Sequence, residues 1–298
     1  MACGHRGLIC AICVICGFHN MKFDLIAIDL DSTLLSSAGQ VTPRSREALE
    51  RAHRAGVEIV ICTGRRFSSA MHALDGMSFA DHIVVNNGVV IKEVATTRTI
   101  YSNYFAPEAY VACIRALKRV SPELPVLVMV DEYPEYEFCT DVVEEANEYH
   151  MQYVTLSPEM MRAVATLETL PTRRIIQCCI LHEYERLQAI EASVAQATAG
   201  YATVFIIRSL RYRGSSLEVL PRGASKWQAL QFLAGSYSIP PQRIMAIGDD
   251  LNDVEMIGGA GFGVAMGNAV EPVREAADWV TADRDHDGVA EAIERYAF

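Results

Sequence analysis

Several carboxylates stand where short apolar runs of the chain end, and their types suggest metal chemistry. Asp29 and Asp31 close the first such run, and Asp249 closes another one near the far end of the chain, followed by Asn252 and Asp253. Carboxylates that converge repel one another unless a cation neutralises them. Oxygen ligands without paired His or Cys select a hard ion. We therefore expect a Mg2+ site.

A positive charge suited to phosphate is available at Lys226. This residue follows Gly-Ala-Ser and should lie in the first turn of a helix that runs to Leu233. Its ammonium group is a compact charge that can meet a phosphate. Taken singly, these residues have ordinary explanations, since an Asp at a strand end often caps the next helix. Their combination at corresponding strand ends favours a functional site.

The elements that position these residues are apolar runs alternating with amphipathic stretches, a pattern typical of βαβ units and a parallel sheet. The predicted buried strands are 23–28, 57–62, 83–85, 244–247 and 262–265. Thr42 is the predicted N-cap of a helix that starts at Pro43 and ends at Gly56. Ligands bind at the carboxyl ends of the strands in such sheets.

A different pattern occupies residues 102–212. Its predicted elements are runs at 125–130 and 135–139, a strand at 175–181, and helices at 107–120, 158–167 and 183–199. The strands are unevenly separated, as in an α+β unit. We therefore expect a second domain, 102–212, inserted into an α/β core formed by 21–101 and 213–298.

Composition narrows the class of partner. The 298 residues are 51% hydrophobic and 21% charged, which is typical of a soluble globular protein with a real core. The 26 basic and 37 acidic residues give a net charge of −11. Such a charge repels phosphate backbones and anionic membranes. We expect no nucleic acid and no membrane as a partner, whereas a small anion could bind where local positive charge holds it.

The nine cysteines do not form the dense framework of a small secreted domain. Cys10, Cys13 and Cys16 have a spacing that could indicate an iron–sulfur cluster, but the usual fourth ligand is missing nearby. The apolar run at 8–18 is too short to span a membrane, and no cleavage site follows it. We expect residues 1–20 to be a disordered extension or no part of the fold. The later cysteines fit buried free thiols of a reducing, cytoplasmic compartment.

Four ordered segments resemble the motifs of the haloacid dehalogenase superfamily. Asp29-Leu30-Asp31-Ser32-Thr33 resembles the DxDxT motif, Thr63 the second motif, Lys226 the third, and Gly-Asp-Asp-Leu-Asn-Asp at 248–253 the GDxxND motif. The motif order and the long insertion resemble the Cof-type phosphatase branch, as do Thr63-Gly64-Arg65 and Asn87-Gly88. The resemblance covers residues 21–298 and implies a Rossmann-like α/β core with an inserted α+β cap. Ser32 departs from the family, where glycine is commonest.

The resemblance also implies a mechanism. Asp29 would attack phosphorus to form an aspartyl-phosphate, and Asp31 would protonate the leaving alcohol and then deprotonate water. Mg2+ would be held by Asp29, the main-chain carbonyl of Asp31, and Asp249. Asp253 would support Lys226 or a metal-bound water. The residues expected to bind the phosphoryl group or the substrate are Leu30, Thr63, Gly64, Lys226 and Asn252.

The sequence of the expected cap does not identify the leaving group of the substrate. Arg208, Arg211 and Arg213 could meet a second anionic group or could form a solvated basic turn. The acidic, tyrosine-rich stretch 131–149 is expected at the surface, because its charge would repel a phosphate ester.

These inferences predict a Mg2+-dependent phosphatase of small phosphorylated metabolites such as sugar phosphates. We expect a cytoplasmic monomer or small homo-oligomer. Two alternatives stay open. One is a phosphomutase of the phosphomannomutase type, and the other is a catalytically silent regulator that binds a phosphorylated ligand.

Overall fold

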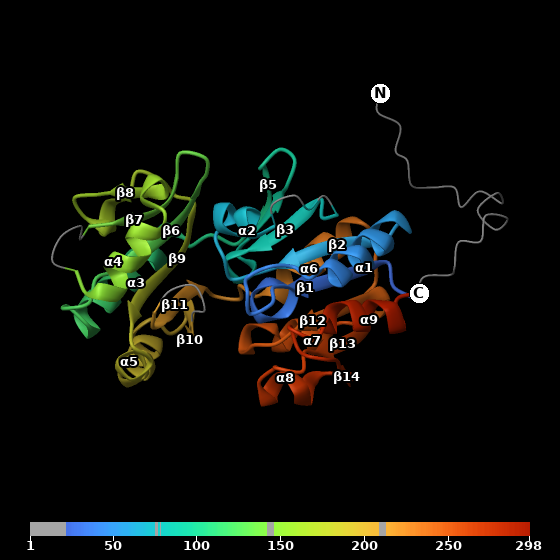
Figure 1. The fold of residues 1–298 in the computed structure, drawn as a ribbon. Coiled ribbons are helices and arrows are strands. Elements are labelled where there is room, and N and C mark those ends of the chain that lie inside the picture. The colour runs from blue at the N-terminus through green and yellow to red at the C-terminus, as the bar shows by residue number, and fades with distance from the viewer. Residues whose placement is uncertain (1–21, 75–76, 78, 142–145, 209–212) are drawn as a thin grey trace, which may run out of the picture.

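The computed structural model describes residues 22–74, 77, 79–141, 146–208 and 213–298, which form two sheet-based domains (Figure 1). The expected extension 1–20 lies outside these residues. The first domain, the core, is drawn in blue at one end of the chain and in orange and red at the other. The second domain, the cap, is drawn from green to yellow, as expected for an insertion.

The core contains one sheet with the strand order β14-β13-β12-β1-β2-β3-β4-β5. Its strands are β1 (Leu25–Asp29), β2 (Glu58–Cys62), β3 (His82–Val85), β4 (Val90–Glu93), β5 (Thr99–Ser102), β12 (Ile244–Gly248), β13 (Phe262–Ala265) and β14 (Trp279–Val280). The strands from β14 to β3 are parallel, and β4 and β5 add an antiparallel edge. All residues of β1, β2 and β12 are buried, because helices cover both faces of the sheet.

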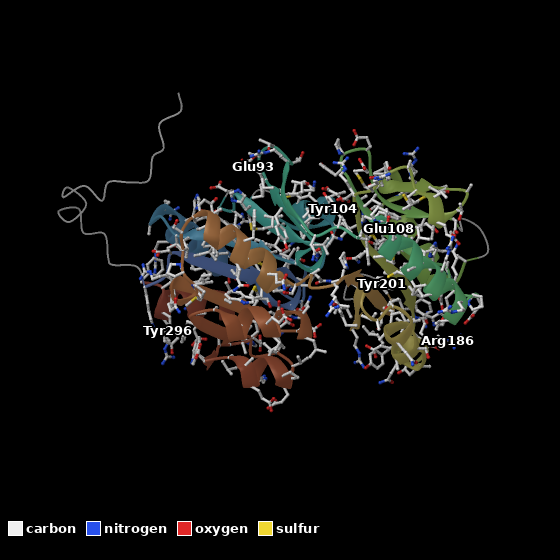
Figure 2. The ribbon with its side chains drawn as sticks, turned by 180° about the vertical axis from the view of Figure 1, so that it is seen from behind. Glu93, Tyr104, Glu108, Arg186, Tyr201 and Tyr296 are labelled. Atoms are coloured by element: carbon white, nitrogen blue, oxygen red, sulfur yellow. The ribbon has the colours of Figure 1, made fainter. Side chains whose placement is uncertain are left out.

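The core helices connect these strands and lie on both faces of the sheet, as the opposite views of Figures 1 and 2 show. They are α1 (Pro43–Arg54), α2 (Phe67–Ala73), α6 (Lys226–Ser236), α7 (Val254–Gly259), α8 (Glu271–Ala276) and α9 (Gly288–Tyr296). Helix α1 packs against α9, and α6 packs against α7. The predicted N-cap Thr42 accepts a hydrogen bond from the Ser45 amide, so this helix starts where expected.

The cap contains a second sheet with the order β10-β11-β9-β6-β7-β8. Its strands are β6 (Leu127–Glu132), β7 (Tyr136–Thr140), β8 (Met161–Ala163), β9 (Ile175–His182), β10 (Ala202–Arg208) and β11 (Ser215–Pro221). Its helices are α3 (Pro107–Val120), α4 (Glu148–Leu156) and α5 (Tyr184–Ala197). Strand β11 lies on the core side of the boundary that we expected at residue 213, so the cap sheet extends past that boundary.

Side-chain alternation gives the cap sheet two apolar faces. In β9, Cys178 and Ile180 belong to a cluster packed with α3 and α5, whereas Cys179 and Leu181 belong to the cluster that continues into the core. Residues that share a face with Cys179 therefore face the core domain. Glu218 of β11 lies directly opposite Cys179 and is one of them.

Two buried ion pairs join the cap to the core. Asp131 of β6 lies 2.5 Å from the Lys92 ammonium, and Glu137 of β7 lies 2.9 Å from the Arg66 guanidinium. Tyr104 also donates to Asp131, and Figure 2 shows it between the two domains. The expectation that this acidic stretch is solvated surface is wrong for Asp131 and Glu137, because cations of the core neutralise both.

The predicted fold class is confirmed: a parallel α/β core carries an inserted cap of mixed helix and strand. One predicted element is wrong. The helix expected at 158–167 is instead a short turn followed by β8, because Pro158 cannot continue α4 and Met161 then pairs with Phe138 as an edge strand. Within the described part of the chain, no helix combines the length and apolarity needed to cross a membrane.

Candidate active site

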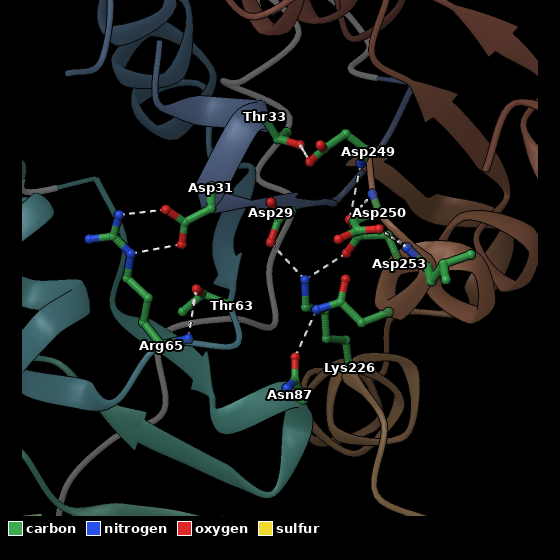
Figure 3. Close-up of polar contacts among 12 residues, drawn as sticks. Asp29, Asp31, Thr33, Thr63, Arg65, Asn87, Lys226, Asp249, Asp250 and Asp253 are labelled. Atoms are coloured by element: carbon green, nitrogen blue, oxygen red, sulfur yellow. Dashed lines mark hydrogen bonds and ion pairs between the residues drawn. The ribbon is translucent and has the colours of Figure 1, made fainter. Parts of the chain in front are cut away.

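Asp29 is the last residue of β1, and its carboxylate lies at the carboxyl edge of the parallel sheet (Figure 3). Strands β2 and β12 flank β1 in parallel, so the segments that follow them emerge at the same edge. This arrangement brings Thr63 and Asp249 to the site of Asp29, although the sequence separates them widely. The side chain of Asp29 is buried.

Lys226 bridges two of the carboxylates. Its Nζ lies 2.7 Å from Asp29 Oδ1 and 2.7 Å from Asp253 Oδ1, and its side chain is fully buried. Burial alone would lower the pKa of Lys226, but Asp253 and Asp29 raise it above its ordinary value. The helix that presents Lys226 begins at this residue, and Ser225 caps it by accepting from the Gln228 amide. Lys226 is therefore a fixed positive charge.

Asp253 is held on both of its oxygens. Oδ1 accepts from Lys226, and Oδ2 accepts from the main-chain amides of Asp249 and Asp250 at 3.0 and 3.2 Å. Asp249 is engaged differently, since Thr33 donates to its Oδ1 at 2.7 Å. These contacts position Lys226 and the loop after β12; the sequence had suggested that Asp253 supports either Lys226 or a metal-bound water.

The acidic cluster fits a hard divalent cation. Oxygens of Asp29, Asp249 and Asp253 lie within 4.8 Å of one another, and all three residues are buried. Burial raises the pKa of Asp29 well above its ordinary range, and burial with the neighbouring Asp253 raises the pKa of Asp249 to about 7. A bound cation would relieve this crowding of negative charge. The donors are carboxylate oxygens, which is the ligand type that Mg2+ prefers.

Asp31 lies in the turn after β1, and Arg65 holds its carboxylate. Arg65 Nε lies 2.7 Å from Oδ2 and Nη2 lies 2.5 Å from Oδ1, so the pair is bidentate. The side chain of Asp31 is not in the acidic cluster that could hold a metal. This is consistent with a metal contact through its main-chain carbonyl.

Thr63, Gly64 and Asn252 are further residues that the sequence predicted to bind phosphate, and Gly64 and Asn252 line one cavity with Asp29. The Thr63 hydroxyl accepts from the Arg65 amide at 3.1 Å. Asn252 donates through Nδ2 to Asn87 Oδ1 at 2.8 Å. Gly64 makes room for this contact, because a Cβ at Gly64 would lie 2.9 Å from Asn87 Oδ1.

Leu30 and Ser32 differ from their neighbours in the first motif. The Leu30 side chain is buried in the apolar core, so only its main chain can meet a phosphate. Ser32 has a φ of 62°, a left-handed conformation that favours glycine. Its hydroxyl accepts from Arg284 at 2.6 Å and its carbonyl from Asn268 at 2.9 Å. These two contacts hold a serine in a conformation that glycine would adopt more easily.

A cavity of about 450 Å3 opens between the acidic cluster and the cap. The core contributes Asp29, Asp31 and Asn252 to its lining, and the cap contributes Gln177, Ser216 and Glu218. Arg208 also lines it, whereas Arg213 contacts Gln152 and Glu148, and Arg211 lies outside the described residues. Of the three arginines, Arg208 is therefore the one that the structure places at the cavity within the described residues.

The sequence drew attention to Arg65 and Asn87 only as parts of motif matches, and it missed Glu218. A glycine stands next to each of the first two, Gly64 before Arg65 and Gly88 after Asn87, and could have marked them. Gly88 has a φ of 91°, and a Cβ there would lie 2.0 Å from the Ser225 carbonyl. Glu218 has no such local signal, because its surroundings come from the fold.

A parallel sheet with a buried acid–lysine cluster at its carboxyl edge, closed by an inserted domain, defines an α/β enzyme core with a capped polar site. Residues 26–293 match the model of the haloacid dehalogenase-like hydrolases, and the chain belongs to this family. The membership predicted from the four motifs, in the Cof-type branch, is confirmed, and with it the class of enzyme, a hydrolase.

Individual relatives resemble the chain over nearly its whole length. The phosphatase YwpJ of Bacillus subtilis is 29% identical over 297 residues, which cover 89% of this chain and 97% of the relative. The 5-amino-6-(5-phospho-D-ribitylamino)uracil phosphatase YitU of the same organism is 26% identical, with 91% and 97% covered. A solved haloacid dehalogenase-like hydrolase from Bacteroides thetaiotaomicron is 32% identical with a TM-score of 0.75, covering 92% and 99%.

Proposed function

We propose that the chain is a Mg2+-dependent phosphatase that hydrolyses small phosphorylated metabolites through an aspartyl-phosphate. The observation that carries the proposal is the pair of carboxylates Asp29 and Asp31 in one cavity, the first bound by Lys226 and the second by Arg65. Relatives named as phosphatases support the same reaction class.

In the first half-reaction, a carboxylate oxygen of Asp29 forms a bond to phosphorus, and the bond from phosphorus to the leaving oxygen breaks. Asp31 donates a proton to that oxygen, so the substrate leaves as an alcohol. Thr63, the Gly64 amide, Lys226 and Asn252 bind the phosphoryl oxygens and stabilise their charge. Asp29, the carbonyl of Asp31, and Asp249 would hold Mg2+, which neutralises charge so that a carboxylate can approach an anionic phosphate.

In the second half-reaction, water attacks the aspartyl-phosphate. Asp31, now a carboxylate, takes a proton from this water while the bond between phosphorus and Asp29 breaks. Phosphate leaves, and Asp29 returns as a carboxylate. Arg65 supports this step because it binds both oxygens of Asp31 and fixes the orientation of the base.

Two buried amides favour a hydroxyl-bearing leaving group such as a sugar. Asn86 and Gln177 are among the residues that line the cavity, and Asn86 Nδ2 and Gln177 Oε1 have no hydrogen-bond partner among the described residues. An unpaired donor and an unpaired acceptor are costly when buried. Hydroxyl groups can both accept and donate, so a sugar phosphate would satisfy the two amides together.

The described cysteines are free and buried, which supports a reducing, cytoplasmic location; they are Cys62, Cys113, Cys139, Cys178 and Cys179. The net charge of −11 supports a small metabolite rather than nucleic acid as the partner. We propose a monomer or a small homo-oligomer.

Phosphate release from p-nitrophenyl phosphate and from a panel of sugar phosphates, nucleotides and cofactor phosphates tests the reaction. We expect turnover by the wild type with Mg2+ and a loss of about 1,000-fold or more in Asp29→Asn. Asp24→Asn is the matched control, because Asp24 precedes the same strand and pairs with Arg243 at its opposite end. Full activity of Asp29→Asn would overturn the proposal.

The same panel separates the two alternatives. Conversion of a hexose 1-phosphate to the 6-phosphate without phosphate release would identify a phosphomutase. Binding of a phosphorylated metabolite, measured by calorimetry, with no hydrolysis would identify a silent regulator.

A further inference from the structure

Glu218 is a buried carboxylate that the mechanism does not yet use. It lies in β11 of the cap, its side chain faces the core, and it lines the cavity beside Asp29. Among the residues that the structure describes, no cation forms an ion pair with it. Burial raises the pKa of Glu218 to about 7, against the effect of a hydrogen bond from Asn87. A buried carboxyl group without an ion-pair partner lowers the stability of the folded protein, so its presence indicates a function.

Glu218 accepts hydrogen bonds from the side chains of Ser216 and Asn87, and Asn87 lies in the turn after β3. Asn87 Nδ2 donates to Glu218 Oε2 at 2.7 Å, and Asn87 Oδ1 accepts from Asn252 Nδ2 at 2.8 Å. Glu218, Asn87 and Asn252 therefore form a row of hydrogen bonds from the cap to the phosphate site predicted at Asn252.

The direction of the hydrogen bonds in this row depends on Glu218. An amide has one donor end and one acceptor end, whereas a carboxylate only accepts. In its ionised form Glu218 therefore requires the Nδ2 end of Asn87 to face the cap, which turns Oδ1 toward Asn252. Asn252 must then present its own Nδ2, and this group has a second hydrogen for another acceptor.

Asn87 has little freedom to move. Its φ of 55° is left-handed, and Gly64 lets the main chain of the turn after β2 lie close to its side chain. The Asn87 amide donates to the Thr63 carbonyl at 3.0 Å. Its side-chain amide can still turn over, and this rotation is what Glu218 would prevent.

We propose that Glu218 is a positioning residue, through which the cap strand β11 orients Asn87 and, through it, the Asn252 amide toward the phosphoryl group. The inference rests on the proposed phosphatase function. Because Glu218 acts on the phosphoryl group that all substrates share, its loss should affect different leaving groups equally.

Kinetics of Glu218→Ala and Glu218→Gln with p-nitrophenyl phosphate and the best sugar phosphate test this. We expect kcat/KM to fall about 10- to 100-fold in the Ala variant, by the same factor for both substrates. The inhibition constant of orthovanadate, which mimics the transferring phosphoryl group, should rise in the Ala variant as kcat/KM falls. Gln keeps an acceptor oxygen, so its loss should be smaller.

Gln177→Ala is the comparison variant, because Gln177 lies on the same face of the cap sheet but does not contact Asn87. Its effect should differ between the two substrates. A double-mutant cycle of Glu218→Ala with Asn252→Ala should be non-additive, since one residue acts through the other. Thermal melting of Glu218→Gln verifies folding.

Losses confined to the sugar phosphate, additive effects with Asn252→Ala, or unchanged vanadate inhibition would each overturn the inference. If the wild type hydrolyses phosphate esters and the Glu218 variants match it, only this inference fails. If the wild type hydrolyses none, the proposed function fails instead.

Discussion

Arg65 donates to both carboxylate oxygens of Asp31, from Nε to Oδ2 at 2.7 Å and from Nη2 to Oδ1 at 2.5 Å. This ion pair connects the ends of β1 and β2. The Arg65 amide also donates to the Thr63 hydroxyl. One residue therefore links the proposed acid–base group to the proposed phosphate site. The guanidinium fork matches a carboxylate in a way that a lysine ammonium does not.

Arg65→Lys should therefore reduce kcat by about 10- to 100-fold while the protein stays folded. The positive charge remains, but Asp31 loses its fixed orientation. Steady-state phosphate release measures the effect. Arg44→Lys is a control, because Arg44 makes a similar bidentate contact with Glu294 on the surface. Equal activities of the two variants would show that orientation of Asp31 is unimportant.

Mg2+ should stabilise the folded protein as well as activate it. The crowding of Asp29, Asp249 and Asp253 is relieved by a bound cation, and saturating Mg2+ should add about 3 kcal/mol, or roughly 5 °C in melting temperature. EDTA should abolish both the stabilisation and the hydrolysis. Asp249→Asn should lose the stabilisation, whereas Asp250→Asn, which alters a neighbouring carboxylate outside the cluster, should keep it. A melting temperature indifferent to Mg2+ in the wild type contradicts this site.

Asp131→Asn should destabilise the protein by about 3–5 kcal/mol in urea unfolding, because it leaves the Lys92 ammonium buried without its charge partner. The next residue offers a matched control. Glu132 pairs with Arg174, whose side chain is half exposed, so Glu132→Gln should cost less than about 1 kcal/mol. Equal losses in the two variants would mean that burial of the ion pair has no energetic consequence.

Glu218→Gln should change how stability depends on pH. Burial raises the pKa of Glu218 from 4.5 to about 7. Between these values the folded state holds a proton that the unfolded chain has released, so this group makes stability fall as pH rises. Gln does not titrate, so the variant should gain up to about 3 kcal/mol relative to wild type between pH 4.5 and 8.

Urea unfolding at pH 5 and pH 8 measures this change. A stability difference that stays constant between the two pH values would contradict a raised pKa of Glu218. Together with the activity loss inferred above, a more stable but slower variant would identify Glu218 as a residue kept for function.

The sequence by itself determined the parts that depend on local pattern. Continuous apolar runs specify buried parallel strands, and polar residues at their ends predicted which side chains would share one edge of the sheet. Asp29 and Asp249 were found in this way, because the topology of a parallel sheet brings strand ends together whatever their separation, whereas Lys226 was found from its place in the first turn of a predicted helix. The helix start at Thr42 followed from capping chemistry.

Only the tertiary structure decided which charges are buried and what they contact. Asp131 and Glu137 look like solvated acids in the sequence, but the cap sheet turns them toward Lys92 and Arg66 of the core. Glu218 is 131 residues from its partner Asn87, so no local pattern could join them. The physical reason is that burial and pairing of a charge depend on packing between domains, whereas strands and caps depend on neighbours along the chain.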